Sequence, residues 1–145
     1  MRITKSKQQS NSLNVKIFRL AGSIGICLAA GIIGSLFTAP AISGWYQFLN
    51  RPVFAPPNWI FAPVWTILYI LMGISLYLAW TRRARLTWFW IQLVLNANWS
   101  LVFFGLRSPK LALLNIIVLW FSIILTIKDF RRKSLTAAWL LVPYF

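Results

Sequence analysis

Four long apolar segments, each free of charged side chains in its interior, constrain the fold of this chain most strongly. They run over residues 18–41, 61–80, 86–106 and 111–127, and Arg19 stands only at the edge of the first. A helix needs about 20 apolar residues to cross the hydrocarbon core of a bilayer. A charge at the centre of such a helix costs about 2.5–3.5 kcal/mol. The pattern therefore predicts an all-α integral membrane bundle.

A fifth apolar segment, residues 134–145, is too short to span a bilayer by the same measure. We expect five transmembrane helices with the fifth incomplete in this chain, either as a short helix or as one that the sequence cuts off. Residues 1–17 are polar and basic. The chain is therefore expected to divide into an N-terminal tail (1–17) and a single helix-bundle domain (18–145).

The composition supports a membrane protein and removes most catalytic chemistry. With 59% apolar and 11% charged residues, the chain is too hydrophobic for a disordered protein and too poor in charge for a soluble domain. It has no His, one Cys (Cys27) and one acidic residue (Asp129). Paired carboxylates, a His-containing triad and a metal site are thereby excluded, and we expect no cofactor. Asp129 is expected to balance nearby charge, and Cys27 to be a small buried apolar residue.

The net charge of +14 does not indicate a nucleic-acid partner, because the basic residues punctuate apolar segments instead of forming one stripe interleaved with aromatic rings. Most fall in three segments that successive spans would place on one side of the membrane, residues 2–19, 82–85 and 128–133. Only Arg51, Arg107 and Lys110 fall on the other side. This asymmetry predicts a cytoplasmic N-terminus.

Small residues recur in the first apolar segment, where Ala30 pairs with Gly34 and Gly31 with Ser35 at a spacing of four. Such pairs let helix backbones approach closely in lipid. Packing between helices of one chain explains them, and so does the face of a homodimer. The sequence leaves both readings open.

The segment between the first two predicted helices combines prolines with aromatic residues. Its prolines, Pro52, Pro56, Pro57 and Pro63, are not expected in a regular helix interior, and the Pro56-Pro57 pair favours a stiff, extended backbone. The aromatic residues are Trp45, Tyr46, Phe48, Phe54, Trp59 and Phe61. An interfacial aromatic belt explains them without a ligand, whereas a stiff loop with inward rings would roof a pocket.

The next two predicted helices each carry a stripe of residues at helical spacing. The stripes are Trp65, Tyr69, Met72 and Leu76, and then Gln92, Asn96, Trp99 and Phe103. The first stripe is explained by packing or by a ligand wall. Gln92 and Asn96 need hydrogen-bond partners within the membrane, either as contacts between helices or as pocket lining. Asn98 and Asn115 are expected to make contacts between helices.

The stretch from Gly44 to Phe104 resembles the TspO/MBR family of tryptophan-rich sensory and translocator proteins, also called peripheral-type benzodiazepine receptors. The resemblance rests on the Trp45-Tyr46 pair and on the runs PVFAPPNW (52–59), PVWTILYILMG (63–73) and QLVLNANWSLVFF (92–104). It implies a five-helix membrane bundle with a porphyrin-binding pocket beneath the first loop. Two departures stand out, because Phe54 replaces a usual Trp and the family's fifth helix continues beyond Pro143-Tyr144.

The resemblance implies these lining residues: Trp45, Tyr46, Pro56, Pro57, Trp59, Trp65, Asn96, Trp99 and Phe103. From their stripes, Tyr69 and Gln92 join this list of candidate ligand-binding residues. The implied ligand is a porphyrin or haem-type molecule, with a sterol or lipid as a further partner besides membrane lipids. Without His, axial ligation of haem iron is not expected.

Three functions remain open at this point. The first is a receptor or carrier for tetrapyrroles and other hydrophobic ligands, acting in porphyrin homeostasis or stress signalling. The second is an enzyme that breaks down porphyrin in light, for which the resemblance implies Trp65 as the catalytic residue. The third is a truncated structural membrane subunit without a competent pocket.

Overall fold

The computed structural model of this chain describes residues 2–42, 44–48 and 57–145, with side chains described from Asn11 onward except those of Trp45 and Gln47. Its five α-helices are α1 (Arg2–Ile42), α2 (Phe61–Thr81), α3 (Thr87–Ser100), α4 (Pro109–Arg131) and α5 (Leu135–Leu140). Short helical turns flank them at η1 (Trp45–Phe48), η2 (Asn58–Ile60), η3 (Leu101–Gly105) and η4 (Val142–Tyr144). Across these residues the chain is helical and has no strand, which confirms the predicted all-α bundle.

The predicted spans correspond closely to these helices. Within the described part of the chain, three helical stretches are long and apolar enough to cross a membrane: Asn11–Ile42, Asn58–Thr81 and Pro109–Arg131. The third predicted span is α3 continued by η3, a π-helical turn. The fifth apolar segment forms the shorter helical stretch Leu135–Tyr144.

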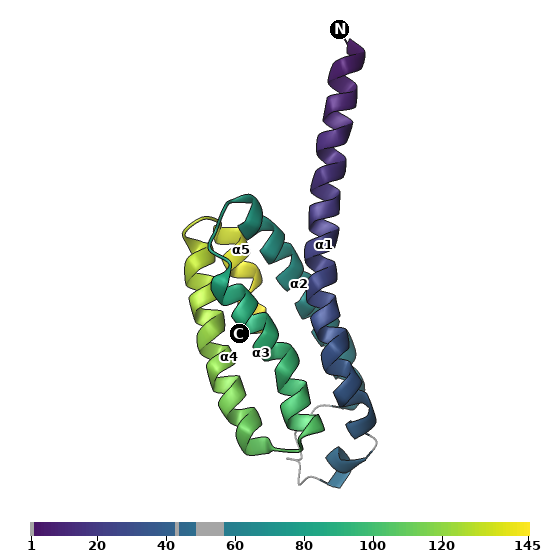
Figure 1. The fold of residues 1–145 in the computed structure, drawn as a ribbon, viewed down its shortest axis with the longest axis vertical. Helices are drawn as coiled ribbons and strands as arrows, with labels where there is room; N and C mark the ends of the chain where they lie inside the picture. Colours follow the sequence, from purple (N-terminus) through teal and green to yellow (C-terminus); the bar gives the residue numbers. More distant parts are fainter. Residues whose placement is uncertain (1, 43, 49–56) are drawn as a thin grey trace.

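Helix α1 is much longer than the apolar segment that predicted it, since it begins at Arg2 instead of near residue 18. The sequence from Arg2 to Ala21 contains neither Gly nor Pro, so nothing in it breaks a helix that the apolar segment stabilises. Figure 1 shows the N-terminal part of α1 extending past the end of the four-helix body formed by α2 to α5. The polar tail is therefore a continuation of the first helix.

The turns between helices follow from local sequence. Pro63 lies in the first turn of α2, where its missing N–H costs no helical hydrogen bond. Arg83, with φ of 54°, reverses the chain between α2 and α3, and the Ala84 N–H donates to the Ala79 carbonyl at 2.9 Å. Ser134 caps α5 by accepting a hydrogen bond from the Ala137 N–H at 3.3 Å.

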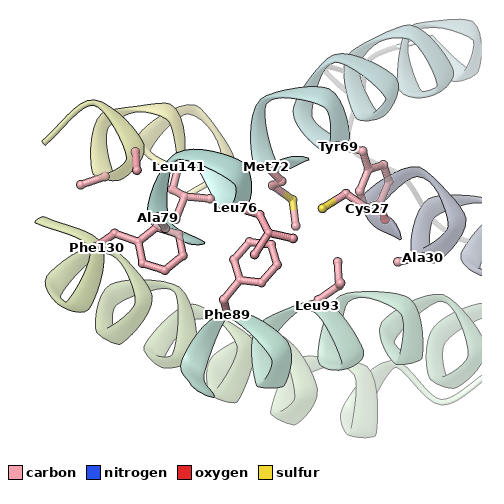
Figure 2. Packing of buried hydrophobic residues seen from close by; sticks show 12 residues of the cluster. Cys27, Ala30, Tyr69, Met72, Leu76, Ala79, Phe89, Leu93, Phe130 and Leu141 are labelled. Atoms are coloured by element: carbon pink, nitrogen blue, oxygen red, sulfur yellow. The ribbon is translucent and has the colours of Figure 1, made fainter. Parts of the chain in front are cut away.

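The core lies where α1, α2 and α3 meet the end of α4 and helix α5 (Figure 2). Phe89 and Phe130 are fully buried and stack with ring centroids 5.8 Å apart. Met72 and Leu76 of α2 fill the space between them and α1. Cys27 is fully buried in the same cluster, which confirms its predicted role as a small apolar residue.

Small residues set the distance between α1 and its neighbours. A Cβ added at Gly73 of α2 would lie 2.4 Å from the Ile24 Cα, and one at Gly31 of α1 would lie 2.4 Å from the Tyr69 ring. A Cβ at Gly34 would meet the Ser100 hydroxyl of α3 at 3.0 Å. Packing within the chain therefore accounts for Gly31 and Gly34, while the homodimer stays a prediction.

The basic segments of the chain gather at one end of the bundle. The α2–α3 turn with Arg82, Arg83 and Arg85 lies at the same end as the α4–α5 turn, and α1 extends past both (Figure 1). The C-terminal end of α1, the start of α2 and the α3–α4 turn lie at the other end. The two ends therefore differ in charge as the alternation of spans predicts.

Candidate functional site

The first loop, which the sequence makes the roof of a pocket, is described only in part. Pro56 and the side chain of Trp45 lie outside the described residues. Pro57 is exposed and Trp59 has 73% of its surface exposed. The described part of the site therefore lies on α2, α3 and η4.

Four side chains from α2, α3 and η4 form a connected group that we call the amide cluster: Trp65, Tyr69, Asn96 and Tyr144. The Tyr69 hydroxyl donates to the Asn96 Oδ1 at 2.5 Å, and the Asn96 Nδ2 donates to the Tyr144 hydroxyl. One amide thus joins three segments that are far apart in sequence. Neutral polar groups buried in a membrane protein need such partners.

The indole of Trp65 completes the amide cluster on its outer side. Its ring centroid lies 5.9 Å from that of Tyr69 and 6.2 Å from that of Tyr144, the latter in an edge-on arrangement. Trp65 keeps 36% of its surface exposed, whereas Tyr69 keeps 8%. The cluster therefore presents one accessible indole backed by two phenols and an amide.

Tyr144 belongs to the amide cluster, but it was not among the candidate ligand-binding residues predicted from the sequence. It lies in η4, the last turn of the fifth apolar segment. A tyrosine hydroxyl in an apolar segment requires a hydrogen-bond partner, and this was the available signal. Its pairing with Asn96 could not be read from spacing, because the two residues come from different helices.

A second aromatic group, the ring cluster, lies around η3 and contains Tyr46, Trp99, Phe103 and Phe104. Trp99 and Phe103 stack with centroids 5.0 Å apart. Tyr46, from η1, contacts the rings of Phe103 and Phe104 at 6.5 Å and 5.7 Å. The ring cluster therefore ties the start of the first loop to the end of the third span.

The π-turn explains why both Phe103 and Phe104 join the ring cluster. Their centroids lie 4.8 Å apart and Phe104 also contacts Trp99 edge-on at 5.9 Å. A π-turn inserts an extra residue and rotates the following side chains relative to a regular helix. The regular stripe predicted from Gln92 through Phe103 consequently omitted Phe104.

Gln92 is the most unusual polar residue near the site. It is fully buried, and among the described residues neither its Nε2 nor its Oε1 has a hydrogen-bond partner. It lies one turn before Asn96 on the inner face of α3. An unpaired buried amide costs about 1–3 kcal/mol, so Gln92 is left with hydrogen-bonding capacity that no described residue uses.

The other residues singled out on α2 and α3 take part in packing or in contacts between helices. Met72 and Leu76 are buried core residues. The Asn115 Nδ2 donates to the Leu95 carbonyl at 3.0 Å, and the Asn98 Nδ2 donates to the Asn115 Oδ1 at 3.4 Å. These two asparagines therefore join α3 to α4, as the sequence predicted.

The described fold and site define a helical membrane protein with an interior of aromatic rings and neutral amides. The sequence profile of the TspO/MBR family matches residues 23–145. The chain is 45% identical to the tryptophan-rich protein TspO of Chlorobaculum tepidum, over 91% of this chain and 88% of that protein. It is 33% identical to the translocator protein of Homo sapiens, over 88% of this chain and 77% of that protein. The chain therefore belongs to the TspO/MBR family and is an integral membrane protein.

Proposed function

We propose that this protein binds porphyrins and other flat hydrophobic ligands at the amide cluster, beneath the connection from α1 to α2. The observation that carries the proposal is the half-exposed Trp65, backed by the hydrogen-bonded Tyr69, Asn96 and Tyr144. An accessible indole offers a stacking surface for a macrocycle. Small-molecule sites typically combine such apolar surfaces with a few fixed polar groups.

The chemistry of the surrounding residues fits this ligand class. Gln92, on the same face of α3 as Asn96, offers an amide that has no partner among the residues the structure describes. Arg107 and Lys110 lie in or beside the α3–α4 turn, at the same end of the bundle as the first loop (Figure 1). They would pair with the carboxylates of a porphyrin. With no His in the chain, the ligand is a metal-free porphyrin or a loosely held haem.

We further propose that binding serves a receptor or carrier role, in porphyrin homeostasis or in stress signalling. Membership of the TspO/MBR family supports this role, since its relatives are named sensory and translocator proteins. The cytoplasmic N-terminus is part of the same proposal and follows from the charge asymmetry.

Titration of protoporphyrin IX into the detergent-purified protein, followed by tryptophan fluorescence, tests the proposal. We expect saturable quenching at micromolar porphyrin, weakened about tenfold in Trp65→Phe, which loses part of the stacking surface. Trp139→Phe is the matched control, because Trp139 lies on α5 and is 64% exposed. Linear quenching that matches free tryptophan, or equal weakening in both variants, would reject the site and leave a structural subunit.

Light-dependent porphyrin breakdown is a second candidate, favoured by the contacts of Trp65 with two tyrosines. In this reaction dissolved dioxygen would oxidise the photo-excited macrocycle, and Trp65, flanked by Tyr69 and Tyr144, would hold the macrocycle against its indole. We expect a product only with light and dioxygen, and its loss in Trp65→Phe at saturating porphyrin. An unchanged porphyrin spectrum in the illuminated wild type would leave the binding role alone.

A further inference from the structure

A groove of about 640 Å³ opens between α1 and the α2–α3 turn, at the opposite end of the bundle from the first loop. Phe18, Gly22 and Ile26 of α1 form one side of the groove. Trp80, at the end of α2, and Trp90, in α3, form the other. A volume of this size is typical of small-molecule sites.

The groove is open along α1 at Gly22, which has no side chain to project into it. A Cβ added at Gly22 would have no heavy atom within 4 Å. The walls are large and accessible, with 79% of Phe18, 50% of Trp80 and 41% of Trp90 exposed. Because α1 and α2 are long and apolar enough to cross a membrane, we expect these walls to face the hydrocarbon of the bilayer, where a lipid acyl chain would fill the groove.

One charged residue, Arg19, lines the groove, and its guanidinium carbon lies 5.5 Å from the ring centroid of Trp80. This cation–π interaction holds the Arg19 guanidinium beside the groove. We call the part of the groove next to Arg19 its mouth. The exposed Arg82, Arg83 and Arg85 stand in and beside the adjoining turn. They add positive charge at the same end of the span.

The chain cannot neutralise these cations itself. It has fifteen basic side chains and one acidic side chain, Asp129, which lies on α4 and not on a groove-forming helix. Anionic lipids in a leaflet attract basic residues near the surface by about 1 kcal/mol each. An apolar groove with a cationic mouth therefore complements a lipid in both of its parts.

We propose that this groove binds one anionic phospholipid of the surrounding leaflet. One acyl chain lies along Gly22 between Phe18 and Trp80, and the phosphate pairs with the Arg19 guanidinium. Arginine suits this position because its planar fork binds a phosphate through two parallel hydrogen bonds while its face remains on an aromatic ring. The site is independent of the porphyrin site, which lies at the other end of the bundle.

Native mass spectrometry of the full chain in detergent tests the headgroup contact. We expect one phosphatidylglycerol to be retained in preference to phosphatidylcholine with the same acyl chains. Arg19→Gln should weaken phosphatidylglycerol binding about tenfold, as expected for the loss of a charge-assisted hydrogen bond. Lys16→Gln is the matched control, because it removes one positive charge from the same helix outside the groove lining.

A second pair of variants tests the acyl-chain contact. Gly22→Leu should fill the groove and lower retention of phosphatidylglycerol at least fivefold. Gly25→Leu is its control, because a Cβ at Gly25 also has no atom within 4 Å and Gly25 does not line the groove. Glycerol phosphate, which lacks acyl chains, should not bind.

Three results would overturn the proposal. The first is equal retention of the two lipids by the wild type, and the second is equal losses in the test and control variants. The third is binding of protoporphyrin IX in place of lipid with the same dependence on Arg19 and Gly22, which would assign the groove to a porphyrin. Circular dichroism of each variant distinguishes a lost site from a lost fold.

Discussion

The two ends of this bundle handle polar groups in opposite ways. At the end of the first loop, the amide of Asn96 is satisfied by two tyrosine hydroxyls, and Trp65 keeps 36% of its surface exposed beside them. At the other end, Arg19 lies on the face of Trp80 beside an open groove, and the only acidic side chain belongs to another helix. Neutral groups can thus be paired within the chain, whereas an excess of like charge requires anions from outside.

Helix α1 shows the same contrast between two of its faces. Toward α2, a Cβ added at Gly31 would lie 2.4 Å from the Tyr69 ring, and one added at Gly73 of α2 would lie 2.4 Å from the Ile24 Cα. A Cβ at Gly22 or Gly25 would have no heavy atom within 4 Å. Glycine therefore closes a helix interface on one face of α1 and leaves space on another.

The largest effect is expected for Gly73→Ala. The new Cβ would lie 2.4 Å from the Ile24 backbone, which can move only by separating α1 from α2. We expect destabilisation by about 2–3 kcal/mol, measured by unfolding of the reconstituted protein. Gly25→Ala is the control and should be neutral or slightly stabilising, because alanine favours a helix. Similar losses in both variants would contradict the contrast between the packed and the open face of α1.

A smaller loss is expected for Asn96→Leu. Removing the amide leaves the hydroxyls of Tyr69 and Tyr144 without their common partner, at a cost of about 1–2 kcal/mol. Porphyrin affinity should fall as well, since Tyr144 loses its anchor beside Trp65. Asn98→Leu, at a weak and exposed hydrogen bond of 3.4 Å, should change stability by less than about 0.5 kcal/mol. An equal effect of the two substitutions would show that the amide cluster does not stabilise the fold.

Gln92→Leu is expected to have the opposite sign. The leucine removes two buried polar atoms that have no partner among the described residues, so stability should rise by about 1 kcal/mol while porphyrin binding weakens. Thermal unfolding and the fluorescence titration measure the two effects. A loss of stability would instead show that Gln92 holds a buried water in the unliganded protein.

The smallest change in stability is expected for Arg19→Gln in a bilayer of zwitterionic lipid. Only the cation–π contact with Trp80 is lost, and it is worth about 0.5–1 kcal/mol at an exposed site. In a bilayer of anionic lipid the loss should be larger, because the bound phosphate is lost too. Lys16→Gln should show no such dependence on lipid charge. The same dependence in both variants would show that anionic lipid acts on basic residues of α1 in general, and not through the groove.

Much of the fold could be predicted from segment length and charge. Runs of about 20 apolar residues can only be satisfied as helices in lipid, so α2, α4 and the apolar part of α1 were predictable. The start of α1 was not, because the polar residues before the apolar segment carry no hydrophobic signal. The π-turn η3 was also hidden, since it depends on packing around Tyr46 and Trp99.

The site divides in the same way. Motifs and helical stripes identified Trp65, Tyr69, Asn96, Trp99 and Phe103, because residues three or four apart share a helix face. The pairing of Asn96 with Tyr144 and the entry of Phe104 into the ring cluster both depend on how separate segments meet. The placements of Trp45 and Pro56 remain predictions.

The sequence by itself determined that this protein is a helical membrane bundle with its charge concentrated at one end, because hydrocarbon admits few other arrangements. Only the tertiary structure decided which polar groups are paired, which glycines close an interface and where a groove remains. The physical reason is that hydrophobicity acts on each segment alone, whereas hydrogen bonds and close packing depend on the distance between segments. Gly22 and Gly73 are the same residue type, and the sequence does not distinguish them. In the structure, Gly22 lines an open groove, whereas Gly73 packs closely against Ile24.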